Sequence, residues 1–305
     1  MLQLRQVSQV VLALALIYAG FLIVSPPFRS FDTTLTVLSQ ATILTVLACG
    51  TTVVLISGGL DLSVGSIFSI VGVVAGQLIT SFHLPIWCVV VLCVLVGTMC
   101  GLLNGLLQVL TKVPAFIVTL GGLTAYRGVA EIAAGGKDMS RFPPEFKMIG
   151  SGYLIPITIM LVVTLVTWLM LSRTRIGNHA YAIGGNEEVA RLSGVNVAAS
   201  RVFYYAFGGM TAAIAAVIQT SRLDFAQSAR GNGYELLAIA AVVIGGTSLF
   251  GGRGGVIRTL LGMLIIQTIS VGLSYMGVDT SSQRITIGII IILAVYLDVQ
   301  RRKSA

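Results

Sequence analysis

Long apolar stretches recur along this whole 305-residue chain and are separated only by short polar breaks. A helix needs about 20 apolar residues to cross the hydrocarbon core of a bilayer. Hydrophobic residues make up 56% of the chain and charged residues only 10%, whereas soluble proteins carry about 25% charged residues. Because this hydrophobicity is not confined to one window, we predict an all-α, polytopic membrane protein and exclude a single anchor on a soluble domain.

We expect about ten transmembrane helices, placed by counting apolar stretches of sufficient length. In order, they cover about 7–25, 35–57, 63–80, 86–110, 114–134, 153–171, 202–220, 234–250, 256–275 and 284–298. No soluble domain is visible, so residues 1–305 are expected to form a single transmembrane domain with one long polar loop at about 172–201.

The basic residues of this loop and of the tail "DVQRRKSA" indicate which side of the membrane they occupy. Lys and Arg gather in the cytoplasmic loops of polytopic proteins. With an even number of spans, both termini are then expected to be cytoplasmic. We interpret the net charge of +8 in the same way, as an orientation signal, and expect no nucleic-acid partner.

Several chemistries lack the residues that they need. The two histidines, His83 and His179, have no second histidine or carboxylate at metal-ligand spacing, so we expect no metal site. Neither stands where it could serve as the base for a nucleophile at membrane depth, so we expect no catalytic residues. No G-x-x-x-x-G-K-[ST] motif is present, and ATP binding by this chain through that loop is excluded.

Acidic residues fall mainly in loops or near span ends, with Asp61, Glu131 and Glu235 as borderline cases. Proton-coupled carriers keep such groups deep within their spans. A proton-coupled carrier is therefore disfavoured, whereas a neutral, hydroxyl-rich solute fits a pathway without a fixed counter-charge. A stand-alone carrier whose sodium site is built from backbone carbonyls, or a passive channel, stays open as an alternative.

Two glycine patterns predict close backbone packing. Gly97, Gly101 and Gly105 recur every four residues, which predicts a tight helix contact. The stretches "GGLDLSVG" (58–65) and "GGTSLFGG" (245–252) share the pattern GGxxLxxG and form a candidate internal repeat.

The stretch "SGGLDLSVGS" (57–66) places an aspartate beside an apolar segment. Gly58 and Gly59 can end one helix, and Asp61 or Ser63 can cap the next. The expected topology puts this stretch at or just within the cytoplasmic face. A helix break with a cap is therefore the preferred interpretation of Asp61, and lining or gating of a pathway and proton carriage are the alternatives.

A short helix is predicted in the loop, within "AIGGNEEVARLSGVNV" (182–197). Asn186 can cap it, Glu187 and Glu188 suit its positive start, and Gly194 suits its end. A helix of this length is marginal in water and needs a surface to dock against. That surface is either the membrane and neighbouring spans, contacted by Val189 and Leu192, or a cytoplasmic protein that supplies the energy for transport.

Four stretches together resemble one family. They are "ISGGLDLSVGS", "KVPAFIVTLGGLTAYRG", "YAIGGNEEVARLSGVNV" and "GYELLAIAAVVIGGTSLFGGRGG". They are similar to the hallmark stretches of the membrane permeases of bacterial ribose, xylose, arabinose and galactose ABC importers, with the ribose permeases as the nearest comparison. The resemblance runs from about residue 35 to residue 298, while 135–152 matches no pattern of the family.

The resemblance implies a multi-pass permease of the bacterial inner membrane that is not itself an enzyme and holds no cofactor. ATP and Mg²⁺ would be bound by two separate ATP-binding subunits on the cytoplasmic side. A periplasmic sugar-binding protein would deliver the sugar, ribose or a similar monosaccharide, to a pathway between this chain and a second permease copy, identical or paralogous. Permeases for autoinducer-2, nucleosides, inositol and some amino acids share this design, so these substrates are alternatives.

The resemblance and the residue types also provide three sets of candidate site residues. The loop helix would couple to the ATPase through Gly185, Asn186, Glu187, Glu188, Ala190, Arg191, Leu192 and Gly194. The pathway or its gate would include Ser57, Gly58, Gly59, Asp61, Asn104, Gln108 and Thr119. The binding protein would dock on Arg29, Lys137, Arg141, Lys147, Arg222 and Arg230, for each of which scattered solvated charge is the alternative.

Overall fold

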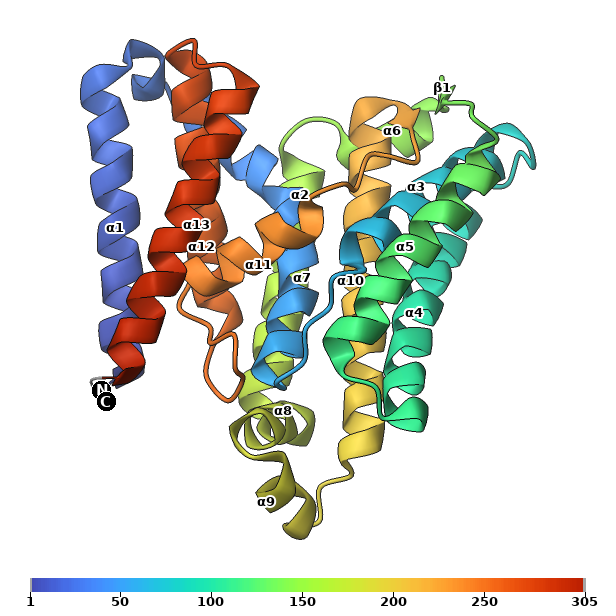
Figure 1. Cartoon of the computed structure of the whole chain (residues 1–305). Coiled ribbons are helices and arrows are strands. Elements are labelled where there is room, and N and C mark those ends of the chain that lie inside the picture. The colour runs from blue at the N-terminus through green and yellow to red at the C-terminus, as the bar shows by residue number, and fades with distance from the viewer. Residues whose placement is uncertain (1, 304–305) are drawn as a thin grey trace.

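The computed structural model describes residues 2–303 of the chain, which are almost entirely helical (Figure 1). The helices are α1 (Leu2–Val24), a 3-10 helix η1 (Pro26–Arg29), α2 (Phe31–Ile56), α3 (Val64–Thr80), α4 (Ile86–Thr111), α5 (Ala115–Ala134), α6 (Pro144–Gly150), α7 (Leu154–Arg173), α8 (Arg175–Gly185), α9 (Glu187–Leu192), α10 (Val197–Leu223), α11 (Tyr234–Ile244), α12 (Val256–Tyr275) and α13 (Thr280–Lys303). Two short strands, β1 (Met139–Ser140) and β2 (Phe225–Ala226), form one antiparallel pair.

The prediction of a helical, polytopic membrane protein is confirmed. Among the described residues, six helices are long and apolar enough to cross a membrane, namely α1, α2, α4, α7, α10 and α12. The total of ten spans and the cytoplasmic side of both termini stay predictions. The prediction for the termini relied partly on the tail "DVQRRKSA" (298–305). The structure describes only the helical backbone of residues 298–303 in this tail.

Two of the expected spans are shorter than a bilayer crossing. The expected segment 234–250 is helical only as far as Ile244, so α11 has 11 residues and a length of about 16 Å. The helix stops because Gly245 and Gly246 follow, and Gly246 adopts a φ of +81° that side chains disfavour. Helix α3 has 17 residues, or about 25 Å. Each helix is therefore shorter than a hydrocarbon core about 30 Å thick.

The centre of the bundle is formed by α2 and α10, whose residues are largely buried. The contact predicted from Gly97, Gly101 and Gly105 is confirmed, and its partner is α10. A Cβ on Gly97 would lie 2.6 Å from the Ala213 side chain, and one on Gly101 would overlap the carbonyl oxygen of Tyr205. The two backbones thus approach as closely as glycine allows.

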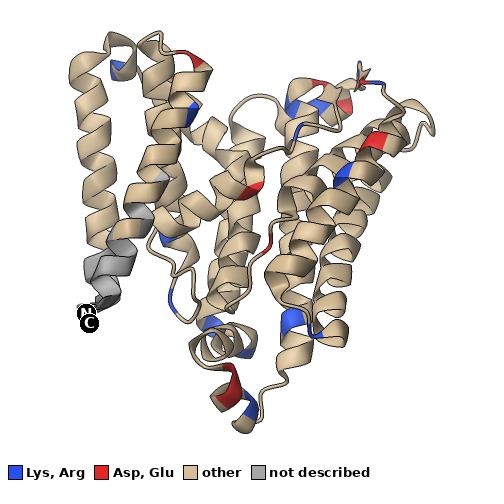
Figure 2. Ribbon diagram, in the orientation of Figure 1, with Lys and Arg blue, Asp and Glu red and all other residues tan. Residues whose placement is uncertain are grey.

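The outer helices present apolar side chains, and charge is concentrated at the two ends of the bundle. On α4, Trp87, Leu95 and Leu110 are exposed, as expected for a surface that faces lipid. Figure 2 shows most Lys, Arg, Asp and Glu residues near the upper and lower ends. Helices α8 and α9 form the lower end, while η1, α6 and β1 lie at the upper end (Figure 1).

Candidate functional site

A seven-residue coil, 57–63, interrupts the chain between α2 and α3. Helix α2 ends at Ile56, and Gly58 then adopts a φ of +79° while its amide donates to the Leu55 carbonyl oxygen over 2.9 Å. The predicted helix break is therefore confirmed. From the lower end of α2 the coil runs upward to the start of α3 (Figure 1).

Asp61 holds the start of α3. Its Oδ1 accepts hydrogen bonds from the backbone nitrogen of Ser63 over 2.8 Å and from Ser63 Oγ over 2.6 Å. Ser63 occupies the N-cap position, but its side chain makes no cap bond, so of the two predicted alternatives, Asp61 or Ser63, the one that gave this role to Ser63 is wrong. Its hydroxyl instead donates to Asp61, which ties the last residue of the coil to the carboxylate.

Asp61 is also more deeply placed than the sequence indicated. Its side chain is buried, with 1% exposure, inside the protein. The coil climbs into the bundle between neighbouring helices instead of turning at the surface, which the expected topology did not anticipate. Its second oxygen, Oδ2, has no hydrogen-bond partner among the described residues, and a buried acceptor without a partner carries a free-energy cost.

Side chains from three other helices fasten the coil. From α4, Asn104 Nδ2 donates to Ser63 Oγ over 2.7 Å, and from α5 Thr119 Oγ1 donates to the Leu60 carbonyl oxygen over 3.1 Å. The Leu60 oxygen also accepts from the Tyr205 hydroxyl of α10 over 3.3 Å. We call this cluster the coil site; it comprises Leu60, Asp61, Ser63, Asn104, Thr119, Tyr126 and Tyr205.

The coil site unites three of the predicted pathway residues and includes two that sequence reasoning missed. Tyr126 donates to Asn104 Oδ1 over 2.9 Å. It lies seven residues after Thr119, two turns along one face of α5, and that spacing was the available signal. Tyr205 carried no comparable signal, because its partner lies 145 positions away.

Three other predicted pathway residues lie beside the coil site and are not joined to it by hydrogen bonds. Ser57 Oγ donates to the Val54 carbonyl oxygen of its own helix over 2.7 Å. Gly59 faces the Tyr205 hydroxyl, which a Cβ there would approach to 2.7 Å. Gln108, one turn after Asn104 on α4, is 9% exposed, and no group in the described part of the chain bonds its Oε1.

Chemically, the coil site is a cluster of hydroxyl, amide and backbone groups around one carboxylate. Its groups hydrogen-bond to one another, and among the described residues only the Oδ2 of Asp61 in this cluster has no partner. A second carboxylate, Glu235, is buried with 7% exposure at the start of α11. It fills the space beside Gly65, where any Cβ would overlap its carboxylate oxygen.

The loop helix forms as predicted. Helix α9 begins after Asn186, whose Oδ1 accepts from the Val189 backbone nitrogen over 3.0 Å, and Gly194 follows it with a φ of +85°. Ala190 faces inward with 3% exposure, whereas Leu192 is 82% exposed. Together with α8, the helix projects at the lower end of the molecule (Figure 1).

Charged residues of the loop stabilise this arrangement. Glu187, in the first turn of α9, forms an ion pair with Arg201 at the start of α10. Glu188 and Arg191 are exposed on α9. The helix is therefore held on one side by its cap and ion pair, and its other side is open.

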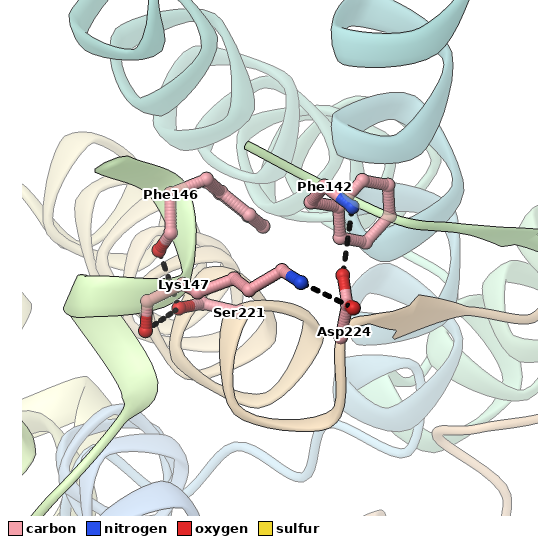
Figure 3. A network of polar contacts seen from close by, with 5 residues as sticks. All are labelled: Phe142, Phe146, Lys147, Ser221 and Asp224. Atoms are coloured by element: carbon pink, nitrogen blue, oxygen red, sulfur yellow. Dashed lines mark hydrogen bonds and ion pairs between the residues drawn. The ribbon is translucent and has the colours of Figure 1, made fainter. Parts of the chain in front are cut away.

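At the opposite end, a polar network joins α6 to the end of α10 (Figure 3). Lys147 Nζ lies 2.6 Å from Asp224 Oδ2, and Asp224 Oδ1 accepts from the Phe142 backbone nitrogen over 2.7 Å. Ser221 Oγ donates to the Phe146 carbonyl oxygen over 2.6 Å. The hydrogen bond from Lys147 lowers the pKa of Asp224 below its ordinary value.

The six predicted docking cations differ in how freely they are displayed. Arg222 is half-buried and donates to the Ser39 carbonyl oxygen over 2.9 Å and to Thr42 Oγ1 over 3.0 Å, so it binds within its own chain. Lys147 is paired with Asp224. Arg29 is exposed, but its Nε donates to the Leu22 carbonyl oxygen over 2.9 Å. Lys137, Arg141 and Arg230 are exposed at their positions.

Comparisons with known proteins extend over nearly the whole chain. The family described as branched-chain amino acid transport system / permease component matches residues 33–295. The ribose import permease protein RbsC of Haemophilus influenzae is 39% identical over 94% of this chain and 91% of its own. The corresponding protein of Bacillus subtilis is 39% identical over 93% and 89%, and the fructose import permease protein FrcC of Rhizobium meliloti is 33% identical over 98% and 86%. No solved structure matches the chain.

Proposed function

The chain belongs to the branched-chain amino acid transport system / permease component family, as the membrane permease of a sugar ABC importer, and from this premise we propose that it imports ribose or a similar neutral monosaccharide. The main support is the similarity to ribose import permeases, which is greater than that to the fructose permease and spans nearly the full length of both chains. As a transmembrane subunit it is not the ATPase.

The partners follow from this role. We propose that two ATP-binding subunits, which bind ATP and Mg²⁺, attach at the end of the molecule that carries α9. A periplasmic sugar-binding protein would attach at the opposite end, and a second permease copy would complete the pathway. In this assembly the chain would lie in the bacterial inner membrane as a single transmembrane domain, residues 1–305.

Coupling to the ATPase is assigned to α9 and its flanks. The supporting observation is the 82% exposure of Leu192 on a helix that is capped, ion-paired and held by the buried Ala190. A large apolar side chain displayed on a rigid, projecting helix suits insertion into a groove of another protein. The contact set would be Gly185, Asn186, Glu187, Glu188, Ala190, Arg191, Leu192 and Gly194.

The passage of sugar is assigned to the region of the coil site. Asn104, Thr119 and Gln108 offer amide and hydroxyl groups, and the coil 57–63 would act as the gate that carries Asp61. A neutral sugar needs transient hydrogen bonds and no fixed counter-charge, which agrees with the scarcity of charge in this region. Sugar specificity would then reside mainly in the binding protein.

Binding-protein docking is assigned to the exposed cations of the opposite end. Lys137, Arg141 and Arg230 are exposed there, and Arg29 is exposed on η1. These would meet acidic residues on the two lobes of the binding protein. Arg222 and Lys147 would support this surface from within, because their hydrogen bonds go to their own chain.

Transport of a sugar can be tested with the whole complex in proteoliposomes. Permease, ATPase and binding protein together are expected to accumulate radiolabelled ribose when ATP is supplied, and not when ATP is withheld. Fructose, allose and galactose are compared in parallel. Accumulation by the permease alone in a sodium gradient would contradict the proposal, and preference for autoinducer-2, inositol or a nucleoside would overturn the substrate assignment.

The coupling assignment needs a separate test on the same complex. Leu192→Asp and the double variant Glu188→Gln with Arg191→Gln are expected to reduce co-purification of the ATPase and uptake together. Arg175→Gln is the matched control, because Arg175 is also exposed in the loop but lies at the start of α8. Normal assembly and normal uptake in both variants would exclude α9 as the coupling element.

A further inference from the structure

Three stretches of chain meet near the lower end of the bundle, where their backbones are in direct contact. The backbone nitrogen of Gly252, in the coil that joins α11 to α12, donates to the carbonyl oxygen of Ile56 at the end of α2 over 2.9 Å. Gly184, near the end of α8, fits against both: a Cβ there would overlap the Ile56 oxygen and lie 2.5 Å from the Gly252 nitrogen. We call Ile56, Gly58, Gly184, Gly251 and Gly252 the glycine junction.

The glycine junction joins the coil that precedes α3 to the coil that follows α11. Gly58 belongs to the coil 57–63, and Gly251 belongs to the coil that follows α11. A Cβ on Gly251 would lie 2.9 Å from the Cα of Gly58 and 2.8 Å from the Gly184 oxygen. The two copies of the GGxxLxxG pattern therefore contact each other here, and α8 closes on both.

Neighbouring contacts stiffen the junction. The Tyr181 hydroxyl of α8 donates to the Gly254 carbonyl oxygen over 3.1 Å. One turn above Ile56, Thr52 Oγ1 lies 2.7 Å from Thr259 Oγ1 of α12. The central contacts involve no side chains, so no change of rotamer can compensate for a displacement of one stretch. The three stretches therefore either move together or separate.

The junction also adjoins both elements to which function has been assigned. Only Gly185 and Asn186 separate Gly184 from α9, and the coil 57–63 leads from the junction to Asp61. Any shift of α8 thus reaches the coil site through backbone contacts alone.

We propose that Gly184 is a positioning residue for transport, which locks α8 to both coils so that a movement of α9 is delivered to the coil site by one rigid unit. This inference rests on the proposed function of α9 as the contact with the ATPase. The absence of a side chain at position 184 is its essential property, because any side chain would push α8 away from Ile56.

Gly184→Ala and Gly128→Ala form a matched pair for testing this role, because Gly128 lies in α5, outside every set of site residues. The added methyl group overlaps the Ile56 oxygen in the first variant, whereas nothing lies within 4 Å of it in the second. Coupling free energies between sites usually correspond to factors of about 5 to 150. We expect Gly184→Ala to co-purify with the ATPase and hydrolyse ATP while sugar uptake falls about tenfold. Gly128→Ala is expected to retain uptake, and equal uptake in the two variants would overturn the inference.

A cross-link tests the rigid unit without depending on the folding of Gly184→Ala. In the double variant Thr52→Cys with Thr259→Cys, oxidation is expected to form a disulfide and to leave uptake by the full complex unchanged, with each single variant as control for the oxidant. Loss of uptake that a reductant restores shows that the stretches separate during transport and excludes a rigid unit. The cross-link reports movements within the permease, whereas the α9 variants report ATPase contact, so the two proposals fail in different experiments.

Discussion

The side-chain nitrogen of Asn104 donates a 2.7 Å hydrogen bond to Ser63 Oγ, which joins α4 to the residue that immediately precedes α3. Ser63 Oγ donates onward to Asp61, and the Tyr126 hydroxyl donates to Asn104 Oδ1. The donors of Asn104 and Ser63 therefore point toward the carboxylate, and the Tyr126 hydroxyl is shared between Asn104 Oδ1 and the Cys100 carbonyl oxygen. In a buried setting, hydrogen bonds arranged in one direction polarise and strengthen one another.

Asn104→Ala is expected to destabilise the protein by about 1–3 kcal/mol, because buried partners lose their hydrogen bonds. Tyr126→Phe removes the preceding donor. If the chain acts as a unit, the double variant costs less than the sum of the two single variants, as measured by thermal unfolding in detergent. Thr124→Ala is the control, since Thr124 is exposed on α5 and its hydroxyl donates to Leu120 of the same helix. Additive effects of Asn104 and Tyr126 would contradict a connected chain.

Two substitutions of Asp61 separate the effect of its hydrogen bonds from the effect of its charge. Asp61→Asn retains an oxygen for the two hydrogen bonds from Ser63, so stability and most uptake should be preserved. Asp61→Leu leaves the Ser63 nitrogen and hydroxyl without their acceptor and is expected to cost about 1–3 kcal/mol for each buried group. Unfolding temperature and uptake are compared for both variants. A stable Asn variant that has lost transport would show that the charge itself is required.

Gly101→Ala tests the contact between α4 and α10. The added methyl group overlaps the Tyr205 carbonyl oxygen, so the helices must separate. Overpacking of this kind typically costs about 1–3 kcal/mol. Gly20→Ala in α1 is the control, because no atom lies within 4 Å of its added Cβ. Equal unfolding temperatures for the two variants would show that the close approach contributes nothing to stability.

The pair of Lys147 and Asp224 predicts a dependence of stability on pH. Because the hydrogen bond with Lys147 lowers the pKa of Asp224 in the folded protein, its stabilising contribution is complete above the ordinary pKa of about 4. It is lost as the pH falls through the lowered folded value. Partly exposed pairs are worth about 0.2–1 kcal/mol, so the effect should be small.

Asp224→Asn is the variant that measures this contribution. Its unfolding temperature should lie below that of the natural protein at neutral pH, and the difference should shrink on acidification. Glu145→Gln is the control, since Glu145 is exposed on α6 and makes no ion pair within the described residues. A difference that does not change with pH would exclude the ion pair as its cause.

Much of the helical framework could be predicted from the sequence because its signals are local. The cap at Asn186, the break at Gly58 and the spacing of Gly97, Gly101 and Gly105 each depend on residues within a turn or two. These features determine the local backbone geometry and the face that a helix buries. They can be predicted without knowing which distant residues pack against them.

The features that escaped prediction depend on distant partners. Arg222 was expected at the surface, yet Ser39 and Thr42, its acceptors, lie about 180 positions earlier in the chain. Gly184 carried no signal, because only the approach of Ile56 and Gly252 requires a glycine there. The early end of α11 was missed because glycine pairs also occur within membrane helices, and nothing local distinguished a break from a continuation.

The coil between α2 and α3 has a consequence for the order in which the protein can mature. Its backbone oxygen at Leu60 accepts from Thr119 and from Tyr205, which are 59 and 145 positions later in the chain. During synthesis from the N-terminus, α2 and α3 therefore exist before either donor has been made. The polar coil must stay hydrated, or be sheltered by the insertion machinery, until α10 arrives. The coil is then enclosed only when α10 packs against α2 and α4, and a chain truncated before Val197 should be recognised by the cell's quality-control proteases as unfinished.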